Sequence, residues 1–331
     1  MVARAYRPQL ATLVKTPPAG DEWLHEIKFD GYRIGCRIRR GRVTLTSRNG
    51  HDWTAAFPEV ADAAARLDTA DALLDGEVAM VLPDGRTSFQ ALQNAFAGAG
   101  SRAPLAYFVF DLLRLDGRSL EALPLEERKA RLQALVGRHG AGSPPRKPAR
   151  RGAKTGRIRY AEHVAGRGAE FFRQACRLGL EGIVSKRRDL PYHPGRHGSW
   201  LKTKCTLRQE FVIGGFTDPQ GIRAGLGALL IGHYEDRRLV FAGKVGTGFT
   251  HRGAIDLRKQ LDAIEQPRCP FDPPPPGSLG RHAHWVRPAL VCDVIFTEWT
   301  TDGRIRHPSF QGLRRDKAPR EVVRERPRRR R

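Results

Sequence analysis

Residues 25–33 read HEIKFDGYR, which places one lysine among acidic residues and ends in an Asp-Gly turn. Because side chains alternate between the two faces of a β-strand, this segment predicts a strand with Glu26, Lys28 and Asp30 on one face. A surface strand whose charges point to water would show the same pattern. The functional interpretation is that Lys28 is a nucleophile held beside groups that bind phosphate and metal.

A pair of lysines occurs in SWLKTKC, residues 199–205. On a strand, Lys202 and Lys204 would share a face with Trp200, and their ammonium groups would lie about 7 Å apart. Two cations at this spacing can line an anionic pocket, although a pair of solvated lysines would look the same in the sequence.

Acidic residues interrupt the apolar segment LLDGEVAM, residues 73–80. Asp75 and Glu77 share one face of the predicted strand, and a buried carboxylate is unfavourable unless it has a partner. We therefore expect these acids to bind something. Glu181 in EGIVSKR is a further acidic candidate, and strand alternation places Lys186 on the opposite face from it.

The charge of the chain indicates a polyanionic partner. Its 331 residues include 58 Lys and Arg against 35 Asp and Glu, which gives a formal net charge of +23. Nucleic acid is the first expectation for such a chain. No apolar run reaches about 18 residues and the N-terminus lacks a signal-peptide core, so we expect a soluble, cytoplasmic protein with no membrane partner.

The cysteines indicate no framework of cross-links. Five of them are scattered without a Cys-x-x-Cys pair: Cys36, Cys176, Cys205, Cys269 and Cys292. Neither a disulfide framework nor a zinc site is indicated, and we expect free thiols in a reducing compartment.

The first part of the chain, to about residue 205, mixes strands and helices. Helical patterns occur near 56–67, 88–97, 126–136 and 168–179. Hairpin turns are predicted at Asn49-Gly50, Asp84-Gly85 and Asp116-Gly117. This order predicts antiparallel sheets flanked by helices. Residues 137–156 are rich in Gly, Pro and Arg, which predicts a mobile basic loop.

After Cys205 the pattern changes to strands with a single helix. Three strand-like runs, a helix near 251–266 and two further strands give the element order of a five-stranded OB barrel. The run CPFDPPPPGSLG, residues 269–280, predicts a loop. The final RERPRRRR, residues 324–331, is too charged to fold alone and predicts a disordered tail.

With these motifs in this order, the chain resembles the covalent nucleotidyltransferase superfamily, and within it the ATP-dependent DNA ligases of the bacterial ligase D type. The resemblance covers about residues 21 to 325. It implies an α+β fold: a nucleotidyltransferase (adenylation) domain of antiparallel sheets flanked by helices over residues 1–205, then an all-β OB-fold domain with one helix over 206–323.

The same resemblance implies a reaction and its partners. ATP and Mg²⁺, or Mn²⁺ in its place, would support the sealing of nicked or broken duplex DNA through a lysyl-AMP intermediate and a DNA-adenylate. The enzyme would act as a monomer near the nucleoid. The resemblance also suggests repair by non-homologous end joining with the Ku end-binding protein.

In that family, the lysine of the first motif attacks the α-phosphorus of ATP, so the resemblance assigns this role to Lys28. It implies that Glu26 contacts the adenine amino group, that Ile27 lies beside the nucleotide, and that Arg33 contacts phosphate or the DNA end. Lys202 and Lys204 would contact the α-phosphate during catalysis.

The remaining motifs receive roles in the same way. Arg48 in TSRNG would grip the phosphate at the nick, and Phe110 in YFVFDLL would stack on adenine. Glu77 would serve the ribose or the metal, and Glu181 would bind the metal. In RIRHPSFQGLRRDK, residues 304–317, Arg306 would contact DNA. The residues implied to orient the pyrophosphate leaving group are Arg314, Asp316 and Lys317. Two positions depart from the family pattern, where relatives often carry Glu: Ile295 and Arg315.

A nucleophilic lysine also needs to lose its proton. A free lysine has a pKa near 10.4, so only about one molecule in a thousand is neutral at pH 7.5. Glu26 and Asp30 would favour the charged form of Lys28. We expect the opposite effect from nearby cations, for which the candidates are Arg33, Lys202, Lys204 and a bound Mg²⁺.

Other functions share parts of this pattern. RNA ligases and mRNA-capping guanylyltransferases also have a Lys-x-Asp-Gly motif and paired lysines, whereas Glu26, the TSRNG hairpin and the end of the barrel favour DNA sealing. An NAD-dependent ligase is disfavoured because its zinc cysteines are missing. A non-catalytic OB-fold protein that only binds nucleic acid is an alternative of another class. A self-adenylation assay separates it from an enzyme.

Overall fold

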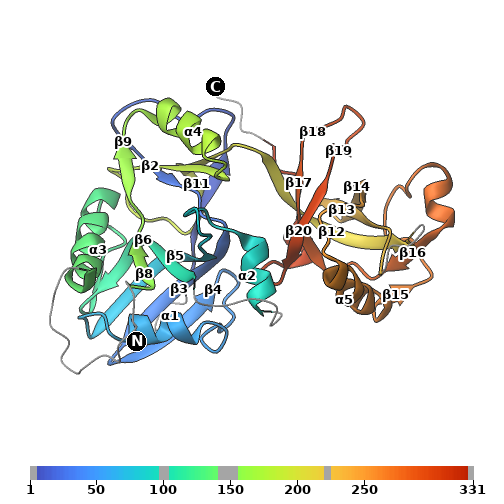
Figure 1. Cartoon of the computed structure of the whole chain (residues 1–331). Coiled ribbons are helices and arrows are strands. Elements are labelled where there is room, and N and C mark those ends of the chain that lie inside the picture. Colours follow the sequence, from blue (N-terminus) through green and yellow to red (C-terminus); the bar gives the residue numbers. More distant parts are fainter. Residues whose placement is uncertain (1–5, 97–103, 141–155, 220–224, 327–331) are drawn as a thin grey trace. The chain divides into compact units, whose positions relative to one another are not determined.

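The computed structural model describes residues 6–96, 104–140, 156–219 and 225–326. The chain divides into two units, of which the first ends at Cys205 and the second spans Thr206–Arg326 (Figure 1). Each unit buries an apolar core of its own. None of the helices in these ranges is long and apolar enough to cross a membrane.

A six-stranded sheet forms the larger layer of the first unit. Its strands follow the order β4-β3-β5-β6-β7, with β8 beside β6. Their bounds are β3 (Gly31–Arg39), β4 (Arg42–Ser47), β5 (Asp71–Met80), β6 (Leu105–Leu115), β7 (Arg118–Ser119) and β8 (Ile158–Tyr160). One face of this sheet carries the core, which α1 (Pro58–Ala64), α2 (Phe89–Phe96) and α3 (Leu125–Gly140) cover. All three helices lie where the sequence predicted them.

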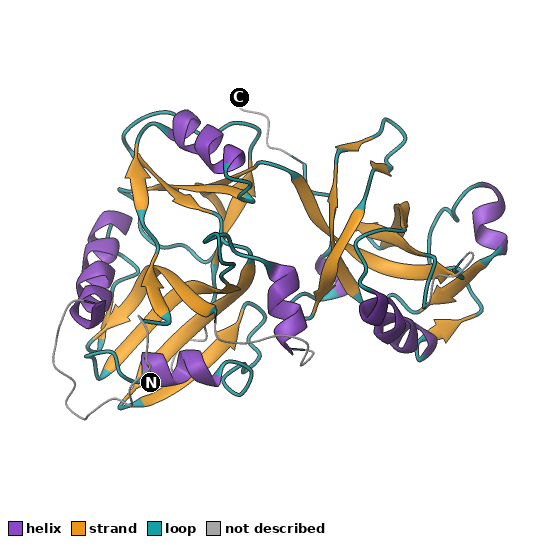
Figure 2. Ribbon diagram, viewed as in Figure 1, coloured by secondary structure: helices purple, strands orange, loops and turns teal. Residues whose placement is uncertain are grey.

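A five-stranded sheet forms the second layer of this unit, in the order β1-β11-β10-β2-β9. The bounds are β1 (Gln9–Leu13), β2 (Trp23–Ile27), β9 (His163–Ala165), β10 (Gly182–Arg187) and β11 (Gly195–Lys204). Helix α4 (Gly168–Arg177) packs against β2, β9 and β10, and Figure 2 shows it on the outside of the sheet. Most strand pairs are antiparallel, whereas β1 runs parallel to β11 and β8 parallel to β6.

The predicted turns form as the sequence indicates. Asp116 and Gly117 have φ angles of 45° and 81° between β6 and β7, and two successive positive φ angles suit a two-residue hairpin turn. Around Asn49-Gly50, the N–H of Ser47 donates to the carbonyl oxygen of His51 at 2.9 Å. The chain therefore reverses direction directly after Arg48.

The second unit is built on a seven-stranded sheet. Its strands follow the order β14-β13-β12-β16-β15, and β17 joins β12 to β20. The bounds are β12 (Leu207–Thr217), β13 (Ala228–Glu235), β14 (Arg238–Val245), β15 (Glu265–Gln266), β16 (Ala283–Val286), β17 (Val291–Phe296) and β20 (Ser309–Arg314). A separate two-stranded hairpin consists of β18 (Glu298–Trp299) and β19 (Ile305–Arg306). The described part of the unit also contains the helical segments α5 (His251–Asp262), η1 (Gly277–Arg281) and η2 (Pro319–Glu321).

The element order of the second unit differs from the prediction in two places. Between α5 and β17 the chain adds β15, which pairs with β16, and β16, which also pairs with β12. Between β17 and β20 it adds the hairpin of β18 and β19. β15 has only two residues, too few to show strand alternation, and the predicted helix near 251–266 included them. β16 follows the proline-rich run that was predicted to be a loop, and it was not predicted. Among the residues that the structure describes, no hydrogen-bonded pairing closes the sheet into a barrel.

The segment HEIKFDGYR is not one strand, so that prediction was wrong. β2 ends at Ile27 and β3 begins at Gly31. Between them, Lys28 to Asp30 carry the chain from the five-stranded sheet to the six-stranded sheet. The three ionic side chains therefore do not share one strand face, and they have different partners.

The expectation of free thiols holds for three cysteines and fails for two. Cys176 and Cys205 form a disulfide, whereas Cys36, Cys269 and Cys292 are free. Cys176 lies in the last turn of α4, and Cys205 follows the last residue of β11. Because α4 packs on β10, the neighbour of β11, tertiary packing brings the two thiols together.

The two segments predicted to be disordered fall mostly outside the described residues. Residues 141–155 of the basic loop and 327–331 of the tail are not described, and residues 137–140 belong to α3. Residues 324–326 are placed, contrary to expectation. The N–H of Glu325 donates to Gln209 Oε1 at 2.9 Å, and the guanidinium of Arg324 lies 4.2 Å from the ring centre of Trp299.

Candidate active site

Three of the predicted site residues meet at one end of the five-stranded sheet. Lys28 follows β2, Glu181 precedes β10, and Lys204 ends β11. Their backbones are linked through Gly182, whose carbonyl oxygen accepts from the N–H of Lys28 at 3.0 Å and which pairs with Lys204. The fold therefore brings together residues that are far apart in the sequence.

Gly182 is needed for this close approach. Its φ is 152°, and a Cβ atom at this position would lie 2.1 Å from the carbonyl oxygen of Thr203. A side chain cannot be accommodated at this distance, so glycine lets β10 begin directly against β11. This backbone contact fixes Glu181 next to the nucleophile candidate.

Lys28 is paired with an acid. Its Nζ donates to Glu181 Oε2 at 2.6 Å, and the lysine side chain is 24% exposed. Burial by itself would lower the pKa of Lys28, but the nearby carboxylates Glu181, Glu77 and Asp30 outweigh burial and raise that pKa. The expectation that neighbouring cations would lower this pKa is therefore wrong for the chain on its own, which favours the ammonium form.

The acidic residues near Lys28 fit a divalent cation. Glu181 contacts Lys28 directly, and Glu77 on β5 acts on the same ammonium through its charge. No group of three or more His, Cys, Asp or Glu side chains suited to a metal occurs in the part of the chain that the structure describes. Mg²⁺ commonly takes only one or two carboxylates and completes its shell with water and substrate phosphate. Glu181 and Glu77 supply two such carboxylates.

Asp30 has a structural partner. Its carboxylate accepts a hydrogen bond from the N–H of Phe89, the first residue of α2, at 2.9 Å. Its own N–H donates to Thr87 Oγ1 at 3.0 Å. A carboxylate is favourable at a helix N-terminus, where backbone N–H groups lack partners. Asp30 therefore anchors the segment that carries Lys28 to the start of α2.

Glu26 is fully buried between two lysines. Its Oε1 accepts from Lys129 Nζ and its Oε2 from Lys186 Nζ, both at 2.6 Å. The ammonium group of Lys186 also lies 4.1 and 4.2 Å from the ring centres of Phe110 and Trp200, which stabilises a buried cation. Burial lowers the pKa of Lys186 to about 8, although Glu26 opposes this shift. Two cations therefore hold one carboxylate in a fixed position.

Arg33 and Asp75 connect the two sheets of the unit. Arg33 donates to both carboxylate oxygens of Asp75, at 2.9 and 2.6 Å, and to the carbonyl oxygen of Gln9 on β1. The hydroxyl groups of Tyr6 and Tyr192 also donate to Asp75. Asp75 therefore has the partner that its buried position required. The guanidinium of Arg33 is engaged inside the unit, whereas the sequence had suggested phosphate or DNA.

Phe108 and Phe110 share one face of β6, opposite the face that carries the helix-covered core. Phe110 is 8% exposed and makes an edge contact with Trp200 at 5.9 Å between ring centres. Phe108, two positions earlier and on the same face, stacks on Phe29 at 4.0 Å. Phe110 was predicted to stack on adenine, whereas the Phe29–Phe108 pair was not predicted. Strand alternation in YFVFDLL and the position of Phe29 next to Lys28 could have indicated it.

The other predicted residues of the first unit lie on nearby elements. Ile27 is the last residue of β2 and pairs with Ile183. Lys202 lies on β11, between its partners on β10 and β1. Arg48 is partly buried in the turn after β4. Lys129 was not predicted, because its place in an amphipathic helix looks like that of a surface residue.

The predicted residues of the second unit form ion pairs within that unit. Arg314 donates to both carboxylate oxygens of Asp316, at 2.8 and 2.6 Å. Lys317 Nζ donates to Glu210 Oε2 at 3.1 Å. Arg306 is exposed. These ion pairs therefore fix the orientations of Arg314 and Lys317.

Comparison with known proteins decides between the candidate functions. The family "ATP dependent DNA ligase domain" matches residues 1–204, and "ATP dependent DNA ligase C terminal region" matches residues 223–317. The chain belongs to the ATP-dependent DNA ligases. Members of this family are enzymes, and membership supports neither the RNA-directed alternatives nor the non-catalytic one.

Relatives of this ligase include large repair proteins. It is 43% identical over 323 residues to the multifunctional non-homologous end joining protein LigD of Pseudomonas aeruginosa. The match covers 97% of this chain and 36% of that protein. The corresponding protein of Mycobacterium tuberculosis is 38% identical over 306 residues, 92% of this chain and 38% of that one. The chain thus spans less than two fifths of these curated relatives.

Solved structures agree with this assignment. A mycobacterial DNA ligase D complexed with ATP and MES matches with a TM-score of 0.69 at 35% identity, covering 96% of this chain and 98% of that one. The ligase domain of M. tuberculosis LigD matches with a TM-score of 0.51 at 36% identity and the same coverage. The predicted α+β fold, a nucleotidyltransferase domain followed by an OB-fold domain, is therefore confirmed for this ligase.

Proposed function

We propose that this ligase seals breaks in duplex DNA in three steps that begin at Lys28. Lys28 Nζ attacks the α-phosphorus of ATP, a P–N bond forms, and pyrophosphate leaves. The AMP group then passes to the 5′-phosphate of the DNA, which frees the lysine. The 3′-hydroxyl attacks that phosphate, a phosphodiester bond forms, and AMP leaves. The observation that carries this proposal is the position of Lys28, 2.6 Å from Glu181 and beside the end of β11.

The acids beside Lys28 control its proton. Their charge raises the pKa of Lys28. The ammonium group must therefore lose its proton before the nitrogen can attack phosphorus. Glu181 and Glu77 would hold Mg²⁺ or Mn²⁺, which, when bound, offsets the charge that develops on the phosphate oxygens. A cation held by Glu181 and Glu77 would also reduce the attraction of these carboxylates for the Lys28 ammonium.

The other residues bind and orient the substrates. Glu26, held by its two lysines, accepts from the adenine amino group, and Ile27 and Phe110 contact the nucleotide. Lys202 and Lys204 contact the α-phosphate through the reaction. Arg314 and Lys317 orient the pyrophosphate leaving group. Arg48 and Arg306 contact the DNA. We revise the role of Arg33, whose engagement with Asp75 supports a positioning role between the sheets.

A pulse-chase experiment tests this proposal. The enzyme is incubated with α-labelled ATP and Mg²⁺, freed of nucleotide, and mixed with a nicked duplex that carries a 5′-phosphate. Label should leave the protein, appear on the 5′-end of the DNA, and be released as AMP when the strand is sealed. Efficient sealing of a nick in RNA, with none in DNA, would overturn the assignment in favour of an RNA ligase.

We further propose that the ligase acts as a monomer in double-strand break repair with an end-binding protein of the Ku type. Sequence identities of 43% and 38% to non-homologous end joining proteins, over 97% and 92% of this chain, support this role. Joining of linear duplexes should increase when purified Ku is added, whereas sealing of an internal nick should not. Equal effects of Ku on both substrates would contradict a specific role at ends.

A further inference from the structure

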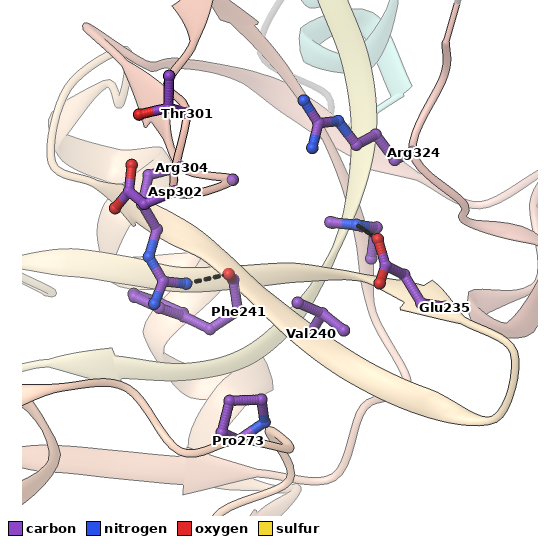
Figure 3. Close-up of a pocket in the computed structure, with 10 residues that line it drawn as sticks. Glu235, Val240, Phe241, Pro273, Thr301, Asp302, Arg304 and Arg324 are labelled. Atoms are coloured by element: carbon purple, nitrogen blue, oxygen red, sulfur yellow. Dashed lines mark hydrogen bonds and ion pairs between the residues drawn. The ribbon is translucent and has the colours of Figure 1, made fainter.

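The second unit contains a pocket that none of the predicted site residues lines. It has a volume of about 350 Å³ and lies between the β13–β14 hairpin, the loop from β18 to β19, and the segment after η2. Figure 3 shows Phe241, Val240 and Pro273 at its floor, with Arg304 and Arg324 on different sides above them. The pocket therefore combines an apolar base with two guanidinium groups.

Each guanidinium rests on an aromatic ring. Arg304 lies 4.5 Å from the ring centre of Phe241 and donates to the carbonyl oxygen of the same residue. Arg324 lies 4.2 Å from the ring centre of Trp299. Stacking of this kind fixes the plane of a guanidinium and leaves its other face and its edge for a ligand.

The two arginines form no direct ion pair within the described ranges. Glu235 and Asp302 also line the pocket and act on Arg324 and Arg304 through their charge, without direct contact. Glu235 is engaged by His233 at 3.3 Å, and Asp302 accepts from the hydroxyl group of Thr300. Burial lowers the pKa of Arg324. An anion in the pocket would compensate both charges.

His233 adds an acceptor without a donor. The residue is 1% exposed, and burial lowers its pKa, so the ring is neutral near pH 7. Its Nε2 lies 3.3 Å from Glu235 Oε1, which assigns the proton to Nε2 and leaves Nδ1 as an acceptor. No group in the described part of the chain satisfies Nδ1. A neutral, buried histidine is therefore part of the pocket lining, together with the two arginines.

We propose that this pocket binds one unpaired nucleotide of a DNA end. The phosphate pairs with the edges of the two guanidinium groups, and the base stacks on a guanidinium plane above the apolar floor. Bases commonly stack on arginine planes in proteins that bind single strands, and such stacking does not depend on sequence. The proposal requires that the substrate is DNA and assigns the second unit a role with ends that carry unpaired nucleotides.

Substitutions that keep the charge and remove the plane test this inference. Arg304→Lys and Arg324→Lys are compared with Arg252→Lys, a control on α5 whose side chain is 80% exposed. Binding of a short oligodeoxythymidine, and of a nicked duplex with and without an unpaired tail, is measured by fluorescence anisotropy without ATP. The pocket variants should bind the oligonucleotide at least about fivefold more weakly, in line with the loss of one stacked base. The control variant should bind it like the wild type.

Control measurements show whether a loss of oligonucleotide affinity is specific to the pocket. The pocket variants should bind the untailed duplex normally, and self-adenylation at Lys28 should be unchanged, so a failure of this inference is separate from a failure of the proposed reaction. Wild-type affinity of both variants for the oligonucleotide would overturn the proposal and show attraction by charge alone. In the wild type, a photoreactive 5-iododeoxyuridine placed in the tail should cross-link to Phe241, which lines the pocket, or to Trp299, the ring beside Arg324. Cross-links found only elsewhere would also overturn it.

Discussion

Glu181→Gln tests how the acid beside the nucleophile sets its protonation. The change keeps the size of the side chain and removes a negative charge 2.6 Å from Lys28 Nζ. At an effective dielectric constant of about 20, two unit charges at this distance attract by about 6 kcal/mol, an upper bound because both groups also lose hydration. An adjacent opposite charge typically shifts a pKa by about 1–3 units. We therefore expect the pKa of Lys28 to fall in this variant, because the largest of the charges that raise it is removed.

Amine-selective acetylation in pulses across a pH series, without ATP or metal, measures this pKa. Only the neutral amine reacts, so the fraction of Lys28 modified, read by peptide mass spectrometry, has its midpoint at the pKa. The wild-type midpoint should lie above that of a free lysine. Glu77→Gln should lower it less than Glu181→Gln, because Glu77 ranks behind Glu181 in raising the pKa. Glu126→Gln, a surface residue paired with Arg188, is the control. An unchanged midpoint in Glu181→Gln would refute the reasoning.

Three further predictions concern the buried clamp, the core and the leaving group. Lys129→Met removes one of the two cations on Glu26, so the ratio of self-labelling with ATP to that with GTP should fall; an unchanged ratio would leave Lys129 a purely structural role. Asp75→Asn leaves a buried guanidinium without its carboxylate and should cost about 3–5 kcal/mol in urea unfolding; a loss under 1 kcal/mol would contradict the network. Lys317→Ala should slow self-adenylation about a hundredfold and spare closure of a pre-adenylated nick, whereas Lys202→Ala should slow both; equal losses for Lys317→Ala would argue against a role confined to pyrophosphate.

Local patterns in the sequence predicted most elements of the fold. Hydrophobic periodicity located the helices, and Asn-Gly and Asp-Gly pairs located the turns, because both depend on residues close in the chain. Where a strand ends was harder to predict. HEIKFDGYR alternates like one strand, but the chain leaves one sheet at Ile27 and enters another at Gly31. Alternation alone cannot show such a change of sheet.

Contacts between distant segments account for what the sequence did not predict. Lys129 meets Glu26 only because α3 packs against β6 and β8, and the two residues are 103 positions apart. The disulfide between Cys176 and Cys205 likewise depends on packing, since neither cysteine belongs to a recognisable pair. The sequence identified Lys28, Glu181 and Lys204 as candidates before their contacts were known. It could not show that Arg33 is engaged by Asp75, because that depends on how two sheets meet.

The central claim is that Lys28 carries AMP between ATP and DNA. The direct test compares Lys28→Ala with Lys259→Ala, an exposed lysine on α5, in labelling by α-labelled ATP and in closure of a nick that already carries a 5′-AMP. The account predicts that Lys28→Ala takes up no label and still closes the pre-adenylated nick, while Lys259→Ala behaves like the wild type in both assays. Labelling of Lys28→Ala at the wild-type yield would contradict the account.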